Sequence, residues 1–266
     1  MLNGENMFNE AVVLENYKNT DNLETRKSLH EKYSTNKTGY QKWMFTQYKF
    51  QPGAKILDIG SGRGEIWKYY LEDEDLLKYG MEITISDSSD GMVEYLTEIF
   101  EGKGISVKKI DINDIPYDDE YFDIVIANSM LYHVKDIDRA LSEVKRVLKN
   151  DGIFYTATFG ENGMIKYLYD SFSELGISYK NNMNISFTLQ NGGRQLEKYF
   201  SNVTKIDYVD SLRIDNVSDY LEYVYSMSSL KGLNREYYPI LLKYFENKKE
   251  DGYLCIPKEH GMFIAL

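Results

Sequence analysis

Short apolar runs alternate with stretches of helical periodicity in the middle of this 266-residue chain. The runs are typical of buried strands, and between them apolar residues recur at the three- and four-residue spacing of a helix. The predicted strands are 55–59, 81–87, 105–110, 122–130 and 153–158. Strands that alternate with helices form parallel sheets with helices on both faces. The pattern therefore predicts a doubly wound α/β fold.

The segments that flank this alternating region read mainly as helices. Ser218 and Asn234 are the expected N-caps of the last two of them, because short polar side chains accept hydrogen bonds from the first free N–H groups. A further helix in the middle region is expected to run from 136 to a stop at Gly152. The remaining predicted elements are helices at 22–33, 39–50, about 163–175, after Asn191, 217–230 and 234–248, and strands at 203–214 and 261–266.

We expect the chain to fold around one sheet with helical additions from both ends. Residues 1–50 are predicted to form an N-terminal helical lid, and residues 51–266 an α/β domain with a helical insertion at about 215–258. A chain of 266 residues is long enough for one such domain and a modest addition. No internal repeat or low-complexity linker divides the sequence further.

The central feature is the stretch KILDIGSGRGE, in which a predicted strand turns into a helix through three glycines. Gly60, Gly62 and Gly64 allow positive φ and a close approach of the backbone to a ligand. A dinucleotide site has its third glycine one residue later, and Glu65 at the helix start disfavours a phosphate. Asp58 instead suits a ligand with positive charge. An ordinary tight turn and a nicotinamide-dependent oxidoreductase are the alternatives.

These residues resemble motif I of the class I methyltransferases that use S-adenosylmethionine (SAM). The resemblance implies a Rossmann-like, doubly wound sheet of seven mostly parallel strands. It also implies SAM as cofactor and S-adenosylhomocysteine as product. The cofactor contacts that it implies in this stretch are Asp58, Gly60, Ser61, Gly62 and Gly64.

A second acidic position follows the second predicted strand. The run ISDSSDGMVE resembles motif II of the same family, which implies that Asp87 binds the ribose hydroxyls, with Ser88 and Met92 beside the cofactor. The sequence separation between Gly60 and Asp87 is larger than the roughly 20 residues usual in such folds. The acidic EDED loop would account for the additional residues. Either Ser88 or Ser89 is expected to cap the next helix. A plain surface acid is the alternative for Asp87.

Two later segments extend the resemblance, which covers about residues 55–158. Asp111 follows the third predicted strand, and the family implies that it and the backbone of Ile112 contact the adenine edge. Loop acids are common, so a structural role is the alternative. Asn128 and Ser129 lie at the carboxyl end of the fourth strand, where open α/β sheets bind ligands. We therefore include both among the cofactor contacts.

Composition narrows the function classes. The formal net charge of −11 and the pI of about 4.9 disfavour nucleic acid, which needs a basic surface. Cys255 is the only cysteine, so a disulfide or a cysteine-built zinc site is not expected, which fits a cytoplasmic protein. With no long apolar stretch we expect neither export nor a membrane span. The sequence leaves the oligomeric state open.

Aromatic residues near the N-terminus are candidates for a lid over the cofactor. N-terminal helices in methyltransferases that this chain resembles often cap the cofactor, so Tyr17 and Tyr33 are included among its predicted contacts, with Tyr40 as a further lid candidate. Simple packing on the core is the alternative for all three.

Methyl transfer from a sulfonium needs positioning more than covalent or metal catalysis, since the leaving group is already activated. His133, just past the fourth strand, is the histidine placed where an acceptor would approach, and it is the candidate general base. The tetrad that begins at Asn128, at the end of that strand, reads NSML and lacks the Pro-Pro-aromatic pattern of nucleic-acid amino-methylating enzymes. We therefore expect a small-molecule acceptor. The alternatives are a protein or RNA methyltransferase and a SAM-binding protein without turnover.

Overall fold

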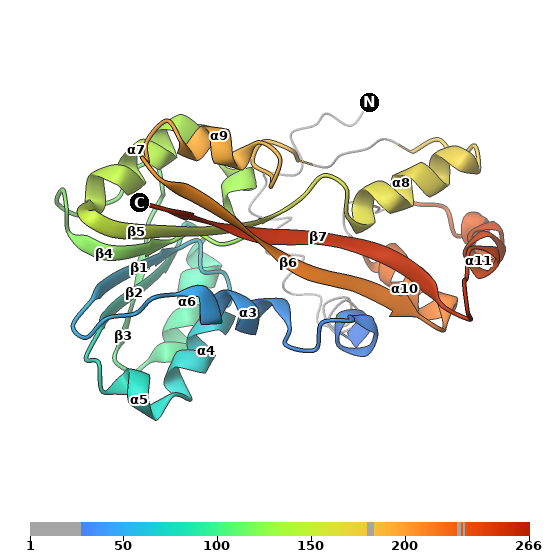
Figure 1. The fold of residues 1–266 in the computed structure, drawn as a ribbon. Helices are drawn as coiled ribbons and strands as arrows, with labels where there is room; N and C mark the ends of the chain where they lie inside the picture. Colours follow the sequence, from blue (N-terminus) through green and yellow to red (C-terminus); the bar gives the residue numbers. More distant parts are fainter. Residues whose placement is uncertain (1–27, 180–183, 228–229, 231) are drawn as a thin grey trace. The chain divides into compact units, whose positions relative to one another are not determined.

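A computed structural model describes residues 28–179, 184–227, 230 and 232–266. Within these ranges seven strands form a single sheet in the order β3-β2-β1-β4-β5-β7-β6 (Figure 1). The strands are β1 (Lys55–Ile59), β2 (Glu82–Asp87), β3 (Ile105–Lys109), β4 (Phe122–Ile126), β5 (Leu148–Phe159), β6 (Val203–Ile214) and β7 (Leu254–Ala265). Neighbours from β3 to β5 pair in parallel, and β7 pairs antiparallel with β5. The predicted fold class is confirmed.

The chain divides into two compact units, each built from three segments. The sheet unit comprises residues 40–161, 184–208 and 260–266. The helical unit comprises the described residues of 1–39, 162–183 and 209–259. The domain boundaries expected from the sequence, with a lid at 1–50 and an insertion at about 215–258, stay a prediction.

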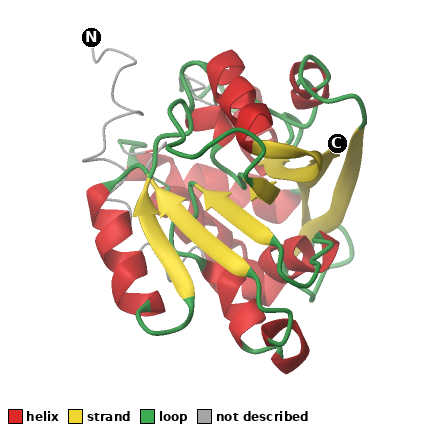
Figure 2. Cartoon of the chain, turned by 90° about the vertical axis from the view of Figure 1, so that its left-hand side faces the viewer, coloured by secondary structure: helices red, strands yellow, loops and turns green. Residues whose placement is uncertain are grey.

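Helices lie on both sides of the parallel strands in the sheet unit (Figure 2). One apolar cluster packs Leu57 of β1 against one set of helices, and another packs the adjacent Ile56 against a second set, because successive strand residues face opposite ways. The first set is α7 (Ile137–Val147) and α9 (Gly192–Leu196), and the second is α3 (Tyr40–Gln47), α4 (Glu65–Leu71) and α6 (Asp90–Phe100). The short α5 (Glu74–Leu77) forms within the acidic run.

The helical unit has a core of its own, in which Leu212 and Ile256 at the distal ends of β6 and β7 pack with helices. Residues 28–33 form one of these helices. The others are α8 (Met164–Glu174), α10 (Val217–Ser226), the 3₁₀ turn η4 (Arg235–Tyr237) and α11 (Tyr238–Asn247). A buried ion pair between Lys258 and Asp210 adds a polar contact, and Asp210 also accepts the N–H of Asn36 (3.0 Å).

Two boundaries in the sheet unit differ from the sequence-based prediction. The fourth strand ends at Ile126 and not at Met130, because the chain leaves the sheet through Ser129, which has φ 54°. The helix expected to continue to Gly152 ends at Val147. Residue 148 instead pairs with Phe122, so that Gly152 lies within β5.

The expected cap at Ser218 and the start of the last strand also need correction. The side chain of Asn216, and not that of Ser218, caps α10 by accepting the Ser218 N–H (3.2 Å). Asn191 precedes α9, but its side chain accepts the N–H of Thr188 (2.8 Å) and so closes a turn before the helix. The last strand begins at Leu254 and not at 261, since it extends into the helical unit.

Candidate functional site

The glycine turn follows β1 directly and has the predicted backbone. Gly60, Gly62 and Gly64 have φ of 69°, 54° and 63°, the left-handed region in which a side chain is strained. Ser61 ties the turn to β2, since its N–H donates to Ser86 O (2.8 Å) and its hydroxyl to Asp58 O (2.9 Å). These bonds hold the backbone at the carboxyl ends of β1 and β2.

Two of the glycines are also places of close packing. A Cβ added at Gly60 would lie 2.8 Å from Met130 Cγ, and one at Gly64 would lie 2.7 Å from Phe100 Cε2. Met130 follows β4, so the glycine turn and the exit of β4 lie in contact. This contact is at the point where the strand order of the sheet reverses, between β1 and β4.

Asp87, the last residue of β2, lies against the same turn. Its Oδ2 accepts the Gly62 N–H (3.2 Å), and its Oδ1 accepts the Ser89 N–H (3.0 Å). Of its predicted neighbours, Ser88 is exposed, and Met92 is buried on α6. Ser89, and not Ser88, occupies the N-cap position of α6, but its side chain makes no capping bond. Asp87 thus joins the ends of two parallel strands.

Asp58 is the buried carboxylate of the site, with 4% of the residue exposed. Its Oδ2 accepts the indole N–H of Trp67 (2.7 Å), which lies on α4 one turn beyond the glycines. Burial raises the pKa of Asp58 to about 6, although the hydrogen bonds from Trp67 and Ser61 act in the opposite direction. At neutral pH the site therefore carries a buried negative charge.

The loop after β3 holds Asp111 at the surface and Ile112 inside. Asp111 Oδ1 accepts both the backbone N–H (2.9 Å) and the side-chain amide (3.1 Å) of Asn113, which closes the loop on itself. Ile112 is 4% exposed and belongs to the core beside α7. Their predicted contact with the adenine edge stays a prediction.

Asn128 and Ser129 occupy the exit of β4. Asn128 Oδ1 accepts the Ala157 N–H (3.0 Å), and its Nδ2 donates to the hydroxyl oxygen of Tyr48 (2.5 Å). Ser129 is exposed, and its N–H donates to Ala157 O (2.8 Å). A left-handed non-glycine residue is uncommon and concentrates at functional sites. The backbone of β4 thus turns outward beside the glycine turn.

His133 ends the 3₁₀ turn η2 (Leu131–His133), which follows this exit. The residue is exposed, and its ring packs on the ring of Tyr132, with centroids 4.5 Å apart. Partial burial lowers the pKa of His133 below its ordinary value, since it disfavours the charged imidazolium. Ser186 donates to the Tyr132 carbonyl (3.0 Å) and so fixes the turn. His133 is therefore a neutral imidazole at pH 7, which can accept a proton.

A family model described as a methyltransferase domain matches residues 57–156. These residues are a class I SAM-dependent methyltransferase domain. The matched segment runs from β1 into β5 and contains the glycine turn, Asp87, the Asp111 loop and the exit of β4.

Curated proteins are similar to this chain over the methyltransferase domain. A malonyl-[acyl-carrier protein] O-methyltransferase of Acetivibrio thermocellus is 30% identical over 125 residues, which cover 47% of this chain and 40% of that protein. A ubiquinone/menaquinone biosynthesis C-methyltransferase of Shewanella halifaxensis is 28% identical over 129 residues, 46% of this chain and 50% of that protein. The chain thus spans about half the length of the curated relatives that it matches.

A solved structure shares the fold over more of the chain. It is a Haemonchus contortus phosphoethanolamine N-methyltransferase in complex with phosphomonomethylethanolamine and S-adenosylhomocysteine. The similarity has a TM-score of 0.51 at 16% identity and covers 85% of this chain and 52% of that one. At this identity it shows the fold alone.

SAM is the cofactor of this class of domain, and the residues of the site fit its chemistry. The carboxylates Asp58 and Asp87 suit an ammonium and a pair of hydroxyls, whereas Glu65 in the first turn of α4 disfavours phosphate. In the described ranges no group of three His, Cys, Asp or Glu side chains could hold a metal ion. Nor is any described helix both long and apolar enough to cross a membrane.

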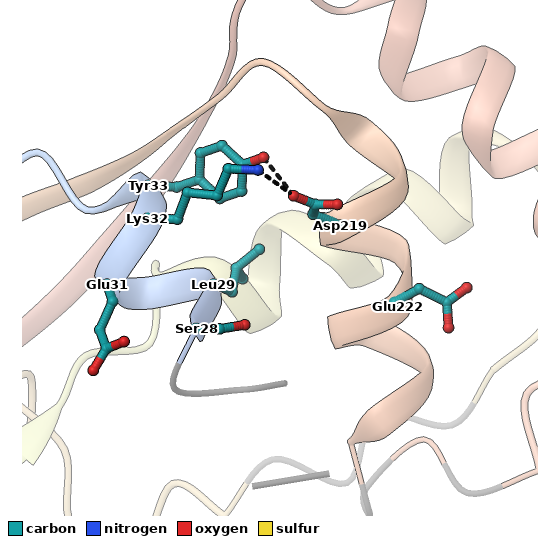
Figure 3. A pocket seen from close by; sticks show the side chains of 7 residues that line it. All are labelled: Ser28, Leu29, Glu31, Lys32, Tyr33, Asp219 and Glu222. Atoms are coloured by element: carbon teal, nitrogen blue, oxygen red, sulfur yellow. Dashed lines mark hydrogen bonds and ion pairs between the residues drawn. The ribbon is translucent and has the colours of Figure 1, made fainter. Parts of the chain in front are cut away.

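Tyr17 and Tyr33 are the lid residues predicted to contact the cofactor. Tyr17 lies outside the described residues. Tyr33 is buried in the helical unit, where its hydroxyl donates to Asp219 Oδ2 (2.6 Å) beside the ammonium of Lys32 (2.8 Å). This ion pair borders a cavity of about 540 Å³ that Glu31 and Glu222 also line (Figure 3). A cofactor contact for Tyr17 and Tyr33 stays a prediction.

Two site residues were not singled out from the sequence. Trp67 and Tyr48 each belong to an apolar helical stripe, which predicts burial but not a polar contact. Both carry a polar group that needs a partner when it is buried. That need is the available signal, yet the sequence does not identify Asp58 and Asn128 as the partners.

Proposed function

We propose that this protein transfers the methyl group of SAM to a small-molecule acceptor. The observation that supports it most is the meeting of Asp87 with the Gly62 N–H inside the matched methyltransferase domain. The Asp87 carboxylate, which can accept hydrogen bonds from two hydroxyls, thus lies beside the glycine turn, whose backbone a ligand can approach closely. Neither group is arranged to hold a pyrophosphate, which disfavours a nicotinamide-dependent oxidoreductase.

In this proposal the predicted carboxylates and loop residues each bind one part of the cofactor. Asp87 accepts the ribose hydroxyls, and Asp58 balances the positive charge of the methionine end. Asp111 and the backbone of Ile112 meet the adenine edge, and Ser129 lies beside the reacting end. SAM supplies an activated methyl group, so the chain needs to orient it and exclude water.

We assign proton abstraction from the acceptor to His133. Its position after the β4 exit and its lowered pKa support this role, since a neutral imidazole is the form that accepts a proton. An acceptor that arrives deprotonated would not need it, and then orientation alone would account for the rate.

The acceptor itself is proposed only as a class. The three similar proteins are an O-, a C- and an N-methyltransferase, so the kind of atom methylated does not carry over from them. The net charge of −11 supports a small molecule over RNA, and the lone Cys255 supports a cytoplasmic location. A protein or RNA methyltransferase and a SAM-binding protein without turnover are the competing proposals.

Calorimetry followed by a transfer assay tests this proposal. The purified protein should bind SAM and S-adenosylhomocysteine and should not bind nicotinamide nucleotides. A fractionated metabolite extract should then take up labelled methyl from SAM in the presence of the protein, whereas RNA and protein fractions should not.

Each competing proposal gives a different result. Binding of nicotinamide nucleotides but not SAM would overturn the methyltransferase proposal. Label in RNA or protein alone would overturn the small-molecule acceptor. Tight SAM binding with no acceptor in any fraction would favour the non-catalytic alternative.

A further inference from the structure

The two hydrogen bonds of Asn128 determine whether the Tyr48 hydroxyl donates or accepts. The Ala157 backbone N–H can only donate, so Asn128 Oδ1 must be the atom that faces it (3.0 Å). Asn128 Nδ2, which has no acceptor capacity, is then the atom 2.5 Å from Tyr48 Oη. Tyr48 Oη therefore accepts this bond, and its own proton remains to be donated elsewhere.

No residue in the described part of the chain accepts that proton. Asn128 is the hydrogen-bond partner of the Tyr48 hydroxyl in the structure, and the residue is only 7% exposed. A buried hydroxyl that donates to nothing is unfavourable, so such a group usually has a ligand or a bound water as its acceptor. Tyr155, which packs on Tyr48, also accepts a bond through its hydroxyl oxygen, from the N–H of Lys49 (3.0 Å), so the surroundings of each hydroxyl decide which of them meets a ligand.

The surroundings of Tyr48 indicate which ligand group it meets. Burial and next the negative charge of Asp58 raise the pKa of Tyr48 well above its ordinary value, so the phenol keeps its proton and lies within electrostatic reach of Asp58. Its partner Asn128 is at the exit of β4, two residues before Met130, which contacts the glycine turn. The free donor and the buried carboxylate thus belong to one end of the site.

We propose that Tyr48 donates its phenolic proton to the carboxylate of the amino-acid end of SAM, while Asp58 faces the ammonium on the same carbon. This inference rests on the proposed function. A carboxylate brought close to Asp58 would be repelled unless a donor accompanied it. Tyr48 supplies that donor, and Asn128 acts through Tyr48 by holding its oxygen.

The test compares two ligands that differ only in this carboxylate. Calorimetry gives the dissociation constants of SAM and of decarboxylated SAM for the wild-type protein, Tyr48→Phe and Tyr155→Phe. A hydrogen bond to a charged group contributes about ten- to a hundredfold in affinity. Tyr48→Phe should therefore weaken the binding of SAM by that factor and leave the binding of decarboxylated SAM nearly unchanged. The dissociation constant of decarboxylated SAM divided by that of SAM should then fall at least about tenfold.

Tyr155→Phe is the matched control, since it removes a buried hydroxyl from the same ring pair and should leave the ratio unchanged. An equal loss for both ligands in Tyr48→Phe, or no loss, would overturn the inference while leaving the methyltransferase proposal intact. Failure of the wild-type protein to bind SAM would overturn both. If Tyr48→Phe does not fold, the wild-type protein decides: it should prefer SAM over decarboxylated SAM at least about tenfold, and no preference contradicts the inference.

Discussion

Two carboxylates near the glycine turn have opposite surroundings, and this difference sets what each can do. Asp58 is buried and accepts one bond from Trp67, whereas Asp87 is half-buried and accepts two backbone N–H groups. Burial without a cationic partner disfavours ionisation, while backbone donors stabilise it. Asp58 therefore titrates near neutral pH, and Asp87 is suited to hydroxyl ligands.

Replacement of Asp87 by alanine should weaken SAM binding about ten- to a hundredfold, because one carboxylate accepting from two hydroxyls contributes roughly 1.5–3 kcal/mol. Calorimetry gives the affinity, and thermal unfolding checks that the fold is intact. Asp90→Ala is the control, since Asp90 is exposed and pairs with Lys109 on the surface. An unchanged affinity in Asp87→Ala would remove this residue from the site.

The raised pKa of Asp58 predicts a pH-dependent stability of the ligand-free protein. The native state holds this proton more tightly than the unfolded chain, so stability is full below pH 4 and falls as pH rises through about 6. A shift of this size corresponds to about 3 kcal/mol at most. Asp58→Asn should therefore be more stable than the wild type at pH 8 and similar to it at pH 4, as measured by urea unfolding.

Asp123→Asn provides a control of opposite sign for Asp58→Asn. Burial alone would raise the pKa of Asp123, but hydrogen bonds from Lys149 and from the Lys55 N–H lower it. The ionised Asp123 therefore stabilises the native state at neutral pH, and this stabilisation is lost as pH falls. Equal pH profiles for wild type and Asp58→Asn would show that burial of this carboxylate does not control stability.

His133→Ala should lower turnover by about a hundredfold or more and leave SAM affinity nearly unchanged, since a general base contributes typically 10² to 10⁴. The loss should shrink at high pH, where the acceptor ionises without help. His133→Gln keeps the size of the side chain without a base and should lose as much. Turnover within about threefold of wild type, with the chemical step rate-limiting, would mean that His133 is not the base.

Single residues show what the sequence could and could not predict. The spacing of the three glycines indicates a turn that uses positive φ, and all three have positive φ in the structure. The partners of Asp58 and Asn128 could not be predicted, because Trp67 and Tyr48 look like ordinary members of an apolar stripe. A hydrogen bond between residues distant in sequence leaves no periodic pattern.

At the level of elements, the turn from β1 into α4 depends on both the conformation and the size of its last glycine. Gly64→Ala would place a left-handed alanine and a Cβ 2.7 Å from Phe100 and 3.0 Å from Leu96, both fully buried. Conformational strain of about 1–2 kcal/mol and overpacking of about 1–3 kcal/mol should together lower the free energy of unfolding by about 2–5 kcal/mol.

Gly80→Ala is the matched control for Gly64→Ala. Gly80 has φ 61°, but a Cβ there has no heavy atom within 4 Å. Gly80→Ala should therefore lower the free energy of unfolding only by the conformational strain. Urea unfolding measures this free energy for both variants. Equal losses would show that contact with Phe100 and Leu96 is unimportant.

The ends of helices and strands were predictable where composition changes sharply, but not where pairing with a distant strand sets the boundary. Residues 203–214 alternate clearly and form β6 over that range. Residues 148–150 continue the helical composition of α7, yet β5 begins there because Leu148 pairs with Phe122. Such pairing overrides local preference, and it depends on a residue 26 positions away.

For the whole molecule, the sequence predicted the type of sheet better than the grouping of helices. The seven-stranded sheet follows from the alternating pattern and the family resemblance. That α8 shares a core with residues 28–33 and with α10 and α11 does not follow, because Leu168, Leu29 and Leu241 are simply apolar positions on amphipathic helices. Their common core arises from long-range contacts.

The position of β7 has a consequence for the order in which the fold can be completed during translation. β7 leaves the ribosome after both β5 and β6, yet it lies between them in the sheet. While β7 is still being synthesised, β6 has no neighbour on the β5 side, and β5 presents an open edge to other chains. The growing chain must therefore hold two unsatisfied edges apart until β7 inserts between them, so a strand made after both of its neighbours closes the sheet from within.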